Sequence, residues 1–301
     1  MTIRYFGKDY CMDSIKLKAM AKINLGLDVV GKRPDGYHDV RMIMQSINLY
    51  DSITITKTKT PKINIKTNLS YLPTNENNLV YKAADLLLKE FHITQGVFIN
   101  LEKHIPVAAG LAGGSSDAAA TLIGINKLFH LGLSKKELMK RGVALGADIP
   151  FCIMRGTALS EGIGEILTPL APMPKCSIII AKPDISVSTK YVYENLRLND
   201  NTKHPNIDTL VTLLKEQDLH GISDNLGNLL EDVTTRKYSV INEIKEFLIQ
   251  QGALNSLMSG SGPTVYGIFE DKDTAYKAKT KLIQAGIAKD VILTSCFNGR
   301  R

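Results

Sequence analysis

The feature that most constrains the fold is a stretch rich in glycine and alanine at residues 106–117, Pro-Val-Ala-Ala-Gly-Leu-Ala-Gly-Gly-Ser-Ser-Asp, which runs directly into further alanines. Its three glycines allow backbone conformations that a side chain forbids, so several N–H groups can converge on one small anion. Ser115, Ser116 and Asp117 can each cap a helix that begins immediately afterwards, and the N-terminus of that helix would attract the same anion. The stretch therefore predicts a phosphate-binding loop, although a plain surface loop before a helix would have the same glycine spacing.

The loop differs from the best-known nucleotide-binding loops. It lacks the Gly-Lys-Ser/Thr ending of a P-loop. The predicted strand over 97–101 is separated from the glycines by Glu102-Lys-His-Ile-Pro106, which does not fit a dinucleotide-binding fingerprint. We therefore expect a nucleotide loop of another type.

Length and charge are consistent with an enzyme that handles a polyphosphate. The 301 residues are sufficient for two domains of ordinary size. The formal charge of +7 suits an anionic partner, but the 37 basic residues are spread along the chain and form no run. A nucleic acid and a polyphosphate substrate account for this diffuse excess equally well.

Cysteine usage and the N-terminus indicate a cytoplasmic protein. Cys11, Cys152, Cys176 and Cys296 are far apart, a pattern more typical of buried, reduced thiols than of metal ligands or disulfides. The first twenty residues carry charges throughout, which excludes a signal peptide, and no apolar run is long enough to span a bilayer. Residues 1–14 show no periodicity and predict a loose arm.

The first half of the chain predicts strands followed by helices. Alternating patterns indicate strands at 15–19 and 23–29, and Pro34-Asp35-Gly36 predicts the turn of a hairpin that returns along 40–49. Two more half-exposed strands are expected at 52–57 and 62–66. Asn78 is expected to cap one helix, and Ser134 and Glu137 to form the capping box of another.

The second half predicts a smaller α+β domain. A proline-rich linker places the boundary near residue 171, which gives domains 1–171 and 172–301. Strands and helices then follow in the order of a ferredoxin-like two-layer domain. The expected elements are strands at 176–181, 253–258, 264–270 and 291–296 and helices at 240–251 and 274–284.

Several side chains outside the loop could carry chemistry. Lys22 and Asn24 share the polar face of a strand, where a solvated lysine is the ordinary interpretation. Asp148 is either a helix cap or a positioned catalytic group. Tyr37 and His38 follow a tight turn that does not require them, and such a pair can stack on a base and hydrogen-bond its edge.

Three stretches resemble, in order, the three motifs of the GHMP kinase superfamily, which includes galactokinase and the homoserine, mevalonate and phosphomevalonate kinases. They are Ala21-Lys-Ile-Asn-Leu25, the loop at 106–120, and Leu257-Met-Ser-Gly-Ser-Gly-Pro-Thr-Val-Tyr-Gly-Ile-Phe269. The segment Arg33-Pro-Asp-Gly-Tyr-His38 is similar to the one that holds a cytosine base in a branch of that superfamily. The resemblance implies an α+β fold with a ribosomal-protein-like α/β N-terminal domain and a ferredoxin-like C-terminal domain.

The resemblance also implies an activity, ATP-dependent phosphorylation of an alcohol, with Mg²⁺ as cofactor. It implies Lys22 and Asp148 as catalytic residues, with Asp148 as general base. The residues implied to bind ATP are Asn78, Lys103, Pro106, Val107, Ala108, Ala109, Gly110, Leu111, Ala112, Gly113, Gly114, Ser115 and Ser116, and Ser116 is the candidate metal contact. The residues implied to bind substrate are Asn24, Tyr37, His38, Asp148, Thr189, Tyr193, Gly260, Ser261 and Gly262.

The implied partner is a small molecule that carries a cytidine diphosphate group, with no nucleic acid or membrane, and the implied assembly is a monomer or homodimer. Two alternatives stay open at this point. Another kinase of the superfamily would have no cytosine to justify Tyr37 and His38. A basic, non-catalytic nucleic-acid-binding protein would not need Lys22, Asp148 and the whole phosphate loop.

Overall fold

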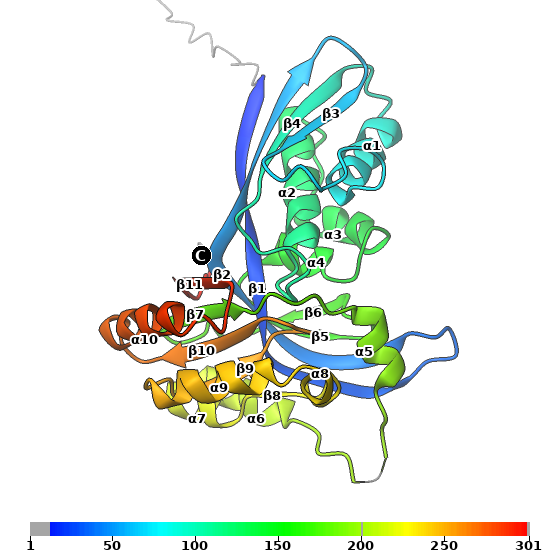
Figure 1. Cartoon of the computed structure of the whole chain (residues 1–301). Helices are drawn as coiled ribbons and strands as arrows, with labels where there is room; N and C mark the ends of the chain where they lie inside the picture. Colours follow the sequence, from blue (N-terminus) through cyan, green and yellow to red (C-terminus); the bar gives the residue numbers. More distant parts are fainter. Residues whose placement is uncertain (1–12, 200, 300–301) are drawn as a thin grey trace, which may run out of the picture.

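The computed structural model describes residues 13–199 and 201–299, and two long strands give it its shape. β1 (Ser14–Lys32) and β2 (His38–Thr58) form an antiparallel hairpin that runs through the length of the molecule, as Figure 1 shows. The two strands predicted at 15–19 and 23–29 are thus one strand, interrupted by irregular register between Met20 and Lys22. Cys11 and nearly all of the arm predicted at 1–14 lie outside the described residues.

The larger sheet has the order β3 (Ile63–Thr67), β4 (Gly96–Glu102), β2, β1, β8 (Gly227–Asn228). β5 (Thr157–Glu161) pairs with β2 and with β6 (Ile166–Pro169). β8 pairs in parallel with β1, so the second half of the chain contributes a strand to the sheet of the first half. The predicted boundary at 171/172 falls between β6 and β7 and stays a prediction.

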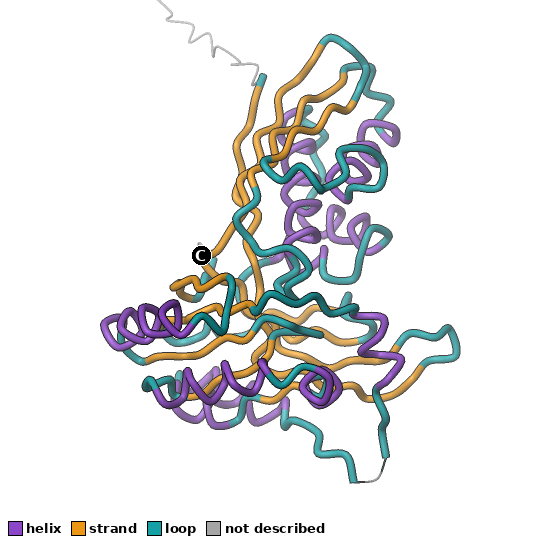
Figure 2. Tube along the Cα trace, in the orientation of Figure 1, coloured by secondary structure: helices purple, strands orange, loops and turns teal. Residues whose placement is uncertain are grey.

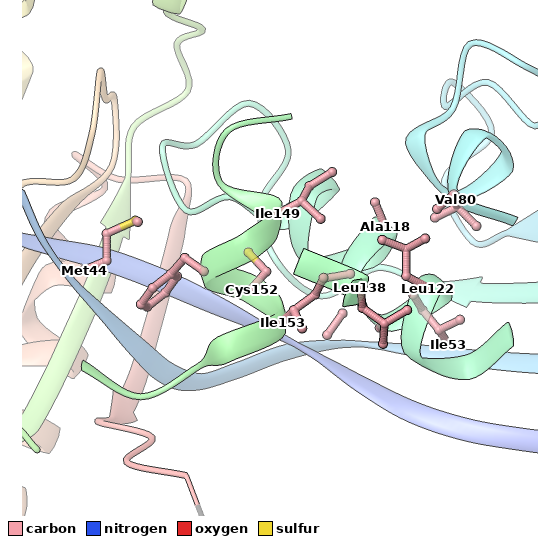
Figure 3. Close-up of a cluster of buried hydrophobic side chains, with 14 of the residues drawn as sticks. Met44, Ile53, Val80, Ala118, Leu122, Leu138, Ile149, Cys152 and Ile153 are labelled. Carbon is pink, nitrogen blue, oxygen red and sulfur yellow. The ribbon is translucent and has the colours of Figure 1, made fainter. Parts of the chain in front are cut away.

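Helices α1 (Leu79–Glu90), α2 (Gly113–Leu128), α3 (Lys135–Val143) and α4 (Ile149–Met154) lie on one side of this sheet (Figures 1 and 2). Asn78 accepts a hydrogen bond from the Val80 N–H, and Ser134 and Glu137 form a capping box, so both predicted helix starts are confirmed. The buried alanines of α2 let it lie close to the sheet. Figure 3 shows side chains of β2, α2, α3 and α4 in this core.

The smaller sheet has the antiparallel order β11 (Asp290–Ser295), β7 (Ser177–Lys182), β10 (Val265–Phe269), β9 (Asn255–Met258). Helices α9 (Val240–Gln250) and α10 (Lys272–Ala285) pack on it through a separate apolar core. With the strands numbered along the chain the order is 4-1-3-2, which is ferredoxin-like as predicted.

Four further helices lie between β7 and β9 in the chain. They are α5 (Thr189–Asn195), α6 (Ile207–Glu216), α7 (Leu219–Asp224) and α8 (Glu231–Lys237). α6 buries Ile207, Leu210 and Leu214 on one face, a pattern that the sequence analysis overlooked. α7 and α8 have too few turns to show such a repeat. Among the helices in the two described ranges, none has the length and hydrophobicity needed to cross a bilayer.

Candidate active site

A cavity of about 1170 Å³ lies where the two halves of the chain meet. Its wall is built from β1, the β1–β2 turn, the glycine-rich loop, the start of α4, α5 and the loop after β9. Most residues predicted for ATP or substrate line it: Lys22, Tyr37, His38, Asn78, Lys103, Pro106, Val107, Ala108, Ala109, Gly110, Ala112, Gly113, Gly114, Ser115, Asp148, Thr189, Tyr193, Gly260 and Ser261. Residues that are distant in the sequence therefore line one cavity.

The backbone of the glycine-rich loop is rich in free donors. Within the described part of the chain, no backbone N–H from Val107 to Ser115 donates a hydrogen bond, whereas the Ser116 N–H donates to the Ala112 carbonyl at 2.8 Å. The N-cap of α2 is Ala112, with no side-chain cap, so the prediction that Ser115, Ser116 or Asp117 caps this helix is wrong. These three residues lie in its first two turns. Except for Leu111, the residues from Val107 to Ser115 line the cavity, and unpaired amides at such a wall suit an anion.

The glycines of the loop have two different roles. The left-handed positions are Ala108, Gly110 and Ala112, with φ of 51°, 72° and 55°. Gly113 and Gly114 are helical instead, which corrects the expectation that all three glycines supply unusual dihedrals. A Cβ on Gly113 would lie 3.2 Å from the Ile105 side chain and 3.3 Å from the Lys103 ammonium, so a larger residue here would crowd both side chains.

Gly110 is held against the second glycine-rich turn. Its carbonyl accepts from the Ser259 hydroxyl at 3.0 Å, and a Cβ on Gly110 would lie 2.2 Å from the Ser259 carbonyl oxygen. Gly260 also lies close to this loop, since its own Cβ would be 3.3 Å from the Gly110 carbonyl oxygen. The loop of the third motif therefore packs directly on the loop of the second.

We expect Gly110→Ala to lower both stability and turnover strongly, because the methyl group would push the two loops apart. Gly132→Ala is the matched control: Gly132 has the same φ of 72° but open space around its Cβ position, so only backbone strain of about 1–2 kcal/mol applies. Thermal melting and kcat of the two variants measure the difference. Equal losses in both would contradict the packing argument.

Beneath the loop lies a buried ion triad. The Lys103 ammonium donates to Asp117 at 2.6 Å and also to Asp51. Asp51 accepts in addition from the backbone N–H groups of His104 and Ile105. Burial and the nearby Asp51 raise the pKa of Asp117 against the opposing effect of Lys103. The triad joins β2, the residues after β4 and the start of α2. It therefore holds both ends of the glycine-rich loop in place.

Lys22 and Asp148 form an ion pair in the wall of the cavity. The Lys22 ammonium lies 4.0 Å from an Asp148 carboxylate oxygen and donates to the Asn24 side-chain oxygen at 2.7 Å. Asp148 occupies the N-cap position of α4 but makes no side-chain cap hydrogen bond, so the simple capping alternative fails. Lys22 is buried and Asp148 is partly exposed. The carboxylate of this ion pair is therefore accessible to a ligand in the cavity, whereas the ammonium is buried.

Asn24 shares a face with Lys22 as predicted, but it lies below the cavity wall. Its side chain is fully buried and its backbone carbonyl accepts from the Tyr266 hydroxyl at 2.8 Å. Because the Asn24 amide oxygen accepts from Lys22, Asn24 orients the ammonium in this structure. Its predicted contact with substrate stays a prediction.

The far end of the cavity is aromatic. The rings of His38 and Tyr193 lie with centroids 5.2 Å apart, and Tyr37 is 60% exposed. Burial lowers the pKa of His38, helped by the nearby Lys32 charge, and burial raises the pKa of Tyr193 to about 12. Thr189 and Ser261 share a hydrogen bond between hydroxyls at 2.8 Å. At neutral pH this end of the cavity thus presents a neutral imidazole and a neutral phenol.

Three further predicted residues do not line the cavity. The Ser116 hydroxyl is buried and donates to the Met20 carbonyl, which gives the predicted Mg²⁺ contact no geometric support, and Ser115 lines the wall instead. Leu111 has a buried side chain, and its carbonyl accepts from the Lys22 N–H at 3.1 Å. Gly262 packs on Met258, whose sulfur would lie 2.5 Å from an added Cβ.

Comparisons with known proteins agree with this arrangement. Residues 78–156 match the model of the N-terminal domain of GHMP kinases, and residues 210–288 match that of the C-terminal domain. A protein of Lachnoclostridium phytofermentans named 4-diphosphocytidyl-2-C-methyl-D-erythritol kinase is 59% identical over 289 residues, 96% of this chain and 99% of the relative. The chain belongs to the GHMP kinase family.

Other GHMP kinases support the same placement. A Clostridium perfringens protein of the same name is 49% identical over 94% of this chain and 99% of the relative. A crystal structure of 4-(cytidine 5'-diphospho)-2C-methyl-D-erythritol kinase superimposes with a TM-score of 0.82 at 30% identity, over 95% of this chain and 100% of that one. A homoserine kinase from Cytophaga hutchinsonii, at 22% identity and a TM-score of 0.79 over 98% of each chain, shares the fold.

The cavity of this GHMP kinase also contains charged residues that the sequence reasoning missed. They are Lys32, Asp35, Asp117, Lys190 and Glu194. Asp117 stands inside the quoted motif and was considered only as a cap, and Lys190 adjoins the predicted Thr189. Lys32 ends β1, where an exposed strand-end lysine is ordinary, so no local signal distinguished it.

Proposed function

We propose that this chain transfers the γ-phosphoryl group of ATP to the 2-hydroxyl of 4-diphosphocytidyl-2-C-methyl-D-erythritol, a step of the non-mevalonate route to isoprenoids. The observation that carries this proposal is one cavity that holds unpaired loop amides, the Lys22–Asp148 pair and an aromatic end with a neutral His38. The names of the relatives that match nearly the whole chain support the choice of substrate.

The catalytic step assigned to Asp148 is proton removal from the acceptor hydroxyl. As that oxygen attacks the γ-phosphorus, its proton passes to the Asp148 carboxylate and the bond to the ADP oxygen breaks. Lys22, 4.0 Å from Asp148, stabilises the ionised carboxylate and the negative charge that develops on the attacking oxygen. Asn24 holds the ammonium in place for both tasks.

The loop fits the phosphates of ATP. The free N–H groups of Val107–Ser115 and the N-terminus of α2 supply donors to the β- and γ-phosphates. Asn78 and Pro106 also line the cavity, and we assign them to the nucleoside end. The buried triad of Lys103, Asp51 and Asp117 keeps these donors preorganised.

The residues present fit Mg²⁺ as a partner of the nucleotide. Ser115 and Asp148 offer oxygen donors in the wall, and one Asp117 oxygen is buried without a partner within the described residues. The described ranges hold no group of three or more His, Cys, Asp or Glu side chains able to bind a metal alone, so phosphate oxygens would supply most ligands. When bound, Mg²⁺ would neutralise charge on the transferring phosphoryl group.

The aromatic end is assigned to the cytosine base, with Tyr37, His38 and Tyr193 around it and Thr189, Ser261 and Gly260 along the sugar and diphosphate. Lys32 adds positive charge to this wall, which suits a diphosphate, whereas Lys190 lies 3.8 Å from Glu194 as an ion pair. A neutral imidazole can donate to and accept from the base edge.

We expect His38→Phe to raise KM for the cytidyl substrate about 10-fold to 100-fold while KM for ATP stays near wild type, because an aromatic ring remains but its hydrogen bonds are lost. The pKa of His38 is lowered from 6.5, so in the wild type the contribution of this residue should be constant above pH 7 and fall below pH 6.5. Steady-state kinetics across pH measure both effects. The control His220→Phe changes an exposed histidine outside the cavity; an equal rise there would remove His38 from the site.

The first experiment is ADP release with Mg-ATP, comparing 4-diphosphocytidyl-2-C-methyl-D-erythritol with mevalonate, homoserine and galactose. Turnover with the cytidyl substrate alone supports the proposal. Turnover with another alcohol alone would keep the kinase and discard the assignment of Tyr37 and His38. Steeply salt-dependent RNA binding without turnover would favour a nucleic-acid-binding protein instead.

Three expectations stay predictions: the cytoplasmic location, the absence of a nucleic-acid partner, and the monomeric or dimeric state. Size-exclusion chromatography with light scattering distinguishes a monomer from a dimer.

A further inference from the structure

Two cysteines that are 120 positions apart in the sequence meet at one end of the smaller sheet, Cys176 directly before β7 and Cys296 directly after β11. The sulfur atoms of Cys176 and Cys296 lie 3.8 Å apart, although the sequence favoured isolated, reduced thiols. β7 and β11 pair antiparallel with Ser177 opposite Ser295, so the same register places Cys176 opposite Cys296. Opposed residues on antiparallel strands have Cα atoms about 4.5–5.5 Å apart, within the range that a disulfide spans.

We propose that Cys176 and Cys296 form a reversible intramolecular disulfide on exposure to a peroxide. Small rotations about the two side chains bring the sulfur atoms to bonding distance, since the backbone register already fits. This inference does not rest on the proposed kinase activity, because neither cysteine lines the cavity.

The chemistry balances with hydrogen peroxide as the two-electron oxidant. A thiolate attacks one peroxide oxygen, the O–O bond breaks, and a sulfenic acid and hydroxide form. The second thiolate then attacks the sulfenic sulfur, the S–S bond forms and the S–O bond breaks. With the two thiol protons, both oxygens leave as water. The hydrogen bond from Cys296 lowers the pKa of Cys176, which favours Cys176 as the first thiolate.

The bond would join two segments that already contact each other beside β2, the linker before β7 and the chain after β11. After β11 the chain pairs with β2, since the Phe297 N–H donates to the Ser46 carbonyl and Asn48 donates to the Cys296 carbonyl. Asn298 donates to the Met173 carbonyl in the linker that leads to Cys176. A disulfide would close the loop from 176 to 296, which spans most of the smaller domain. It would add a covalent bond to these hydrogen-bonded contacts.

The third cysteine in the described residues cannot compete for this bond. Cys152 lies on α4 in the core of the larger domain (Figure 3). Cys176 and Cys296 belong to a different apolar cluster. Burial and the nearby Asp148 raise its pKa to about 12, so its thiolate is scarce. The pairing should therefore be specific.

The test treats the purified, reduced full chain with dilute hydrogen peroxide and measures intact mass and disulfide-mapped peptides. We expect loss of the mass of two hydrogen atoms, a cross-linked peptide pair containing Cys176 and Cys296, and reversal by dithiothreitol. Cys296→Ser should not lose this mass, whereas Cys11→Ser should behave like the wild type. The oxidised protein should melt several degrees higher, because a long loop is closed in its unfolded state.

Several results would overturn the proposal. They are addition of oxygen atoms without a cross-link, a disulfide that maps to Cys11 or Cys152, and a covalent dimer as the main product. If Cys296→Ser fails to fold, peptide mapping of the native wild type decides alone, with urea-unfolded protein as the control for random pairing.

Discussion

Replacing Asp148 with asparagine is expected to lower kcat by about 10²-fold to 10⁴-fold, because the amide cannot accept the proton of the substrate hydroxyl. Binding of ATP without Mg²⁺ should change little, since the loop amides, not Asp148, are assigned to the phosphates. Stability should also change little, because the Asp148 carboxylate caps no helix and is 31% exposed. The loss should therefore fall on turnover alone.

The measurement is ADP release under saturating ATP and cytidyl substrate, with ATP affinity measured separately by calorimetry. Asp184→Asn is the control: Asp184 pairs with Lys289 on an exposed surface outside the cavity, so its loss should leave kcat near wild type. Residual Asp148→Asn turnover within about 10-fold of wild type would remove this residue from the role of general base.

Local signals in the sequence predicted most of the fold. Asn78 and Ser134 satisfy the first amides of their own helices, so a few neighbouring residues determined where α1 and α3 begin. In the β1–β2 turn, Asp35 accepts from the Tyr37 N–H and Gly36 has a φ of 87°, as its Pro-Asp-Gly sequence predicted. Each of these features depends on residues within a few positions of each other.

The errors concern contacts between distant segments. Ala108 and Ala112 adopt left-handed φ angles that alanine rarely takes in a short peptide, so packing of the loop against the rest of the site must hold them there. Asp117 was considered as a cap because its partner Lys103 lies on the far side of the loop, and the third member, Asp51, lies on β2. The Cys176–Cys296 pair arises only when β11 joins β7. Single-sequence reasoning has no access to such contacts unless a family motif supplies them.

Lys103→Met is expected to destabilise the protein by about 3–5 kcal/mol, because it leaves Asp51 and Asp117 as two buried carboxylates without a cation. For a chain of this size, such a loss would lower Tm by roughly 10 °C. Asp117→Asn should cost less, since Lys103 and Asp51 remain paired. Thermal and urea unfolding of the three proteins measure the order.

The pH dependence separates this electrostatic cause from lost packing. Burial already raises the folded-state pKa of Asp117, and removal of Lys103 should raise it further, while the unfolded value stays near 3.9. A carboxyl with a raised folded pKa favours folding at low pH and loses that contribution as pH rises through the folded value. The deficit of Lys103→Met should therefore be small near pH 4 and largest near pH 7. Lys89→Met, which removes an exposed pair with Asp85, should melt near the wild-type temperature at both values. A Lys103→Met deficit that is equal at pH 4 and pH 7 would assign the loss to packing of the lysine side chain instead.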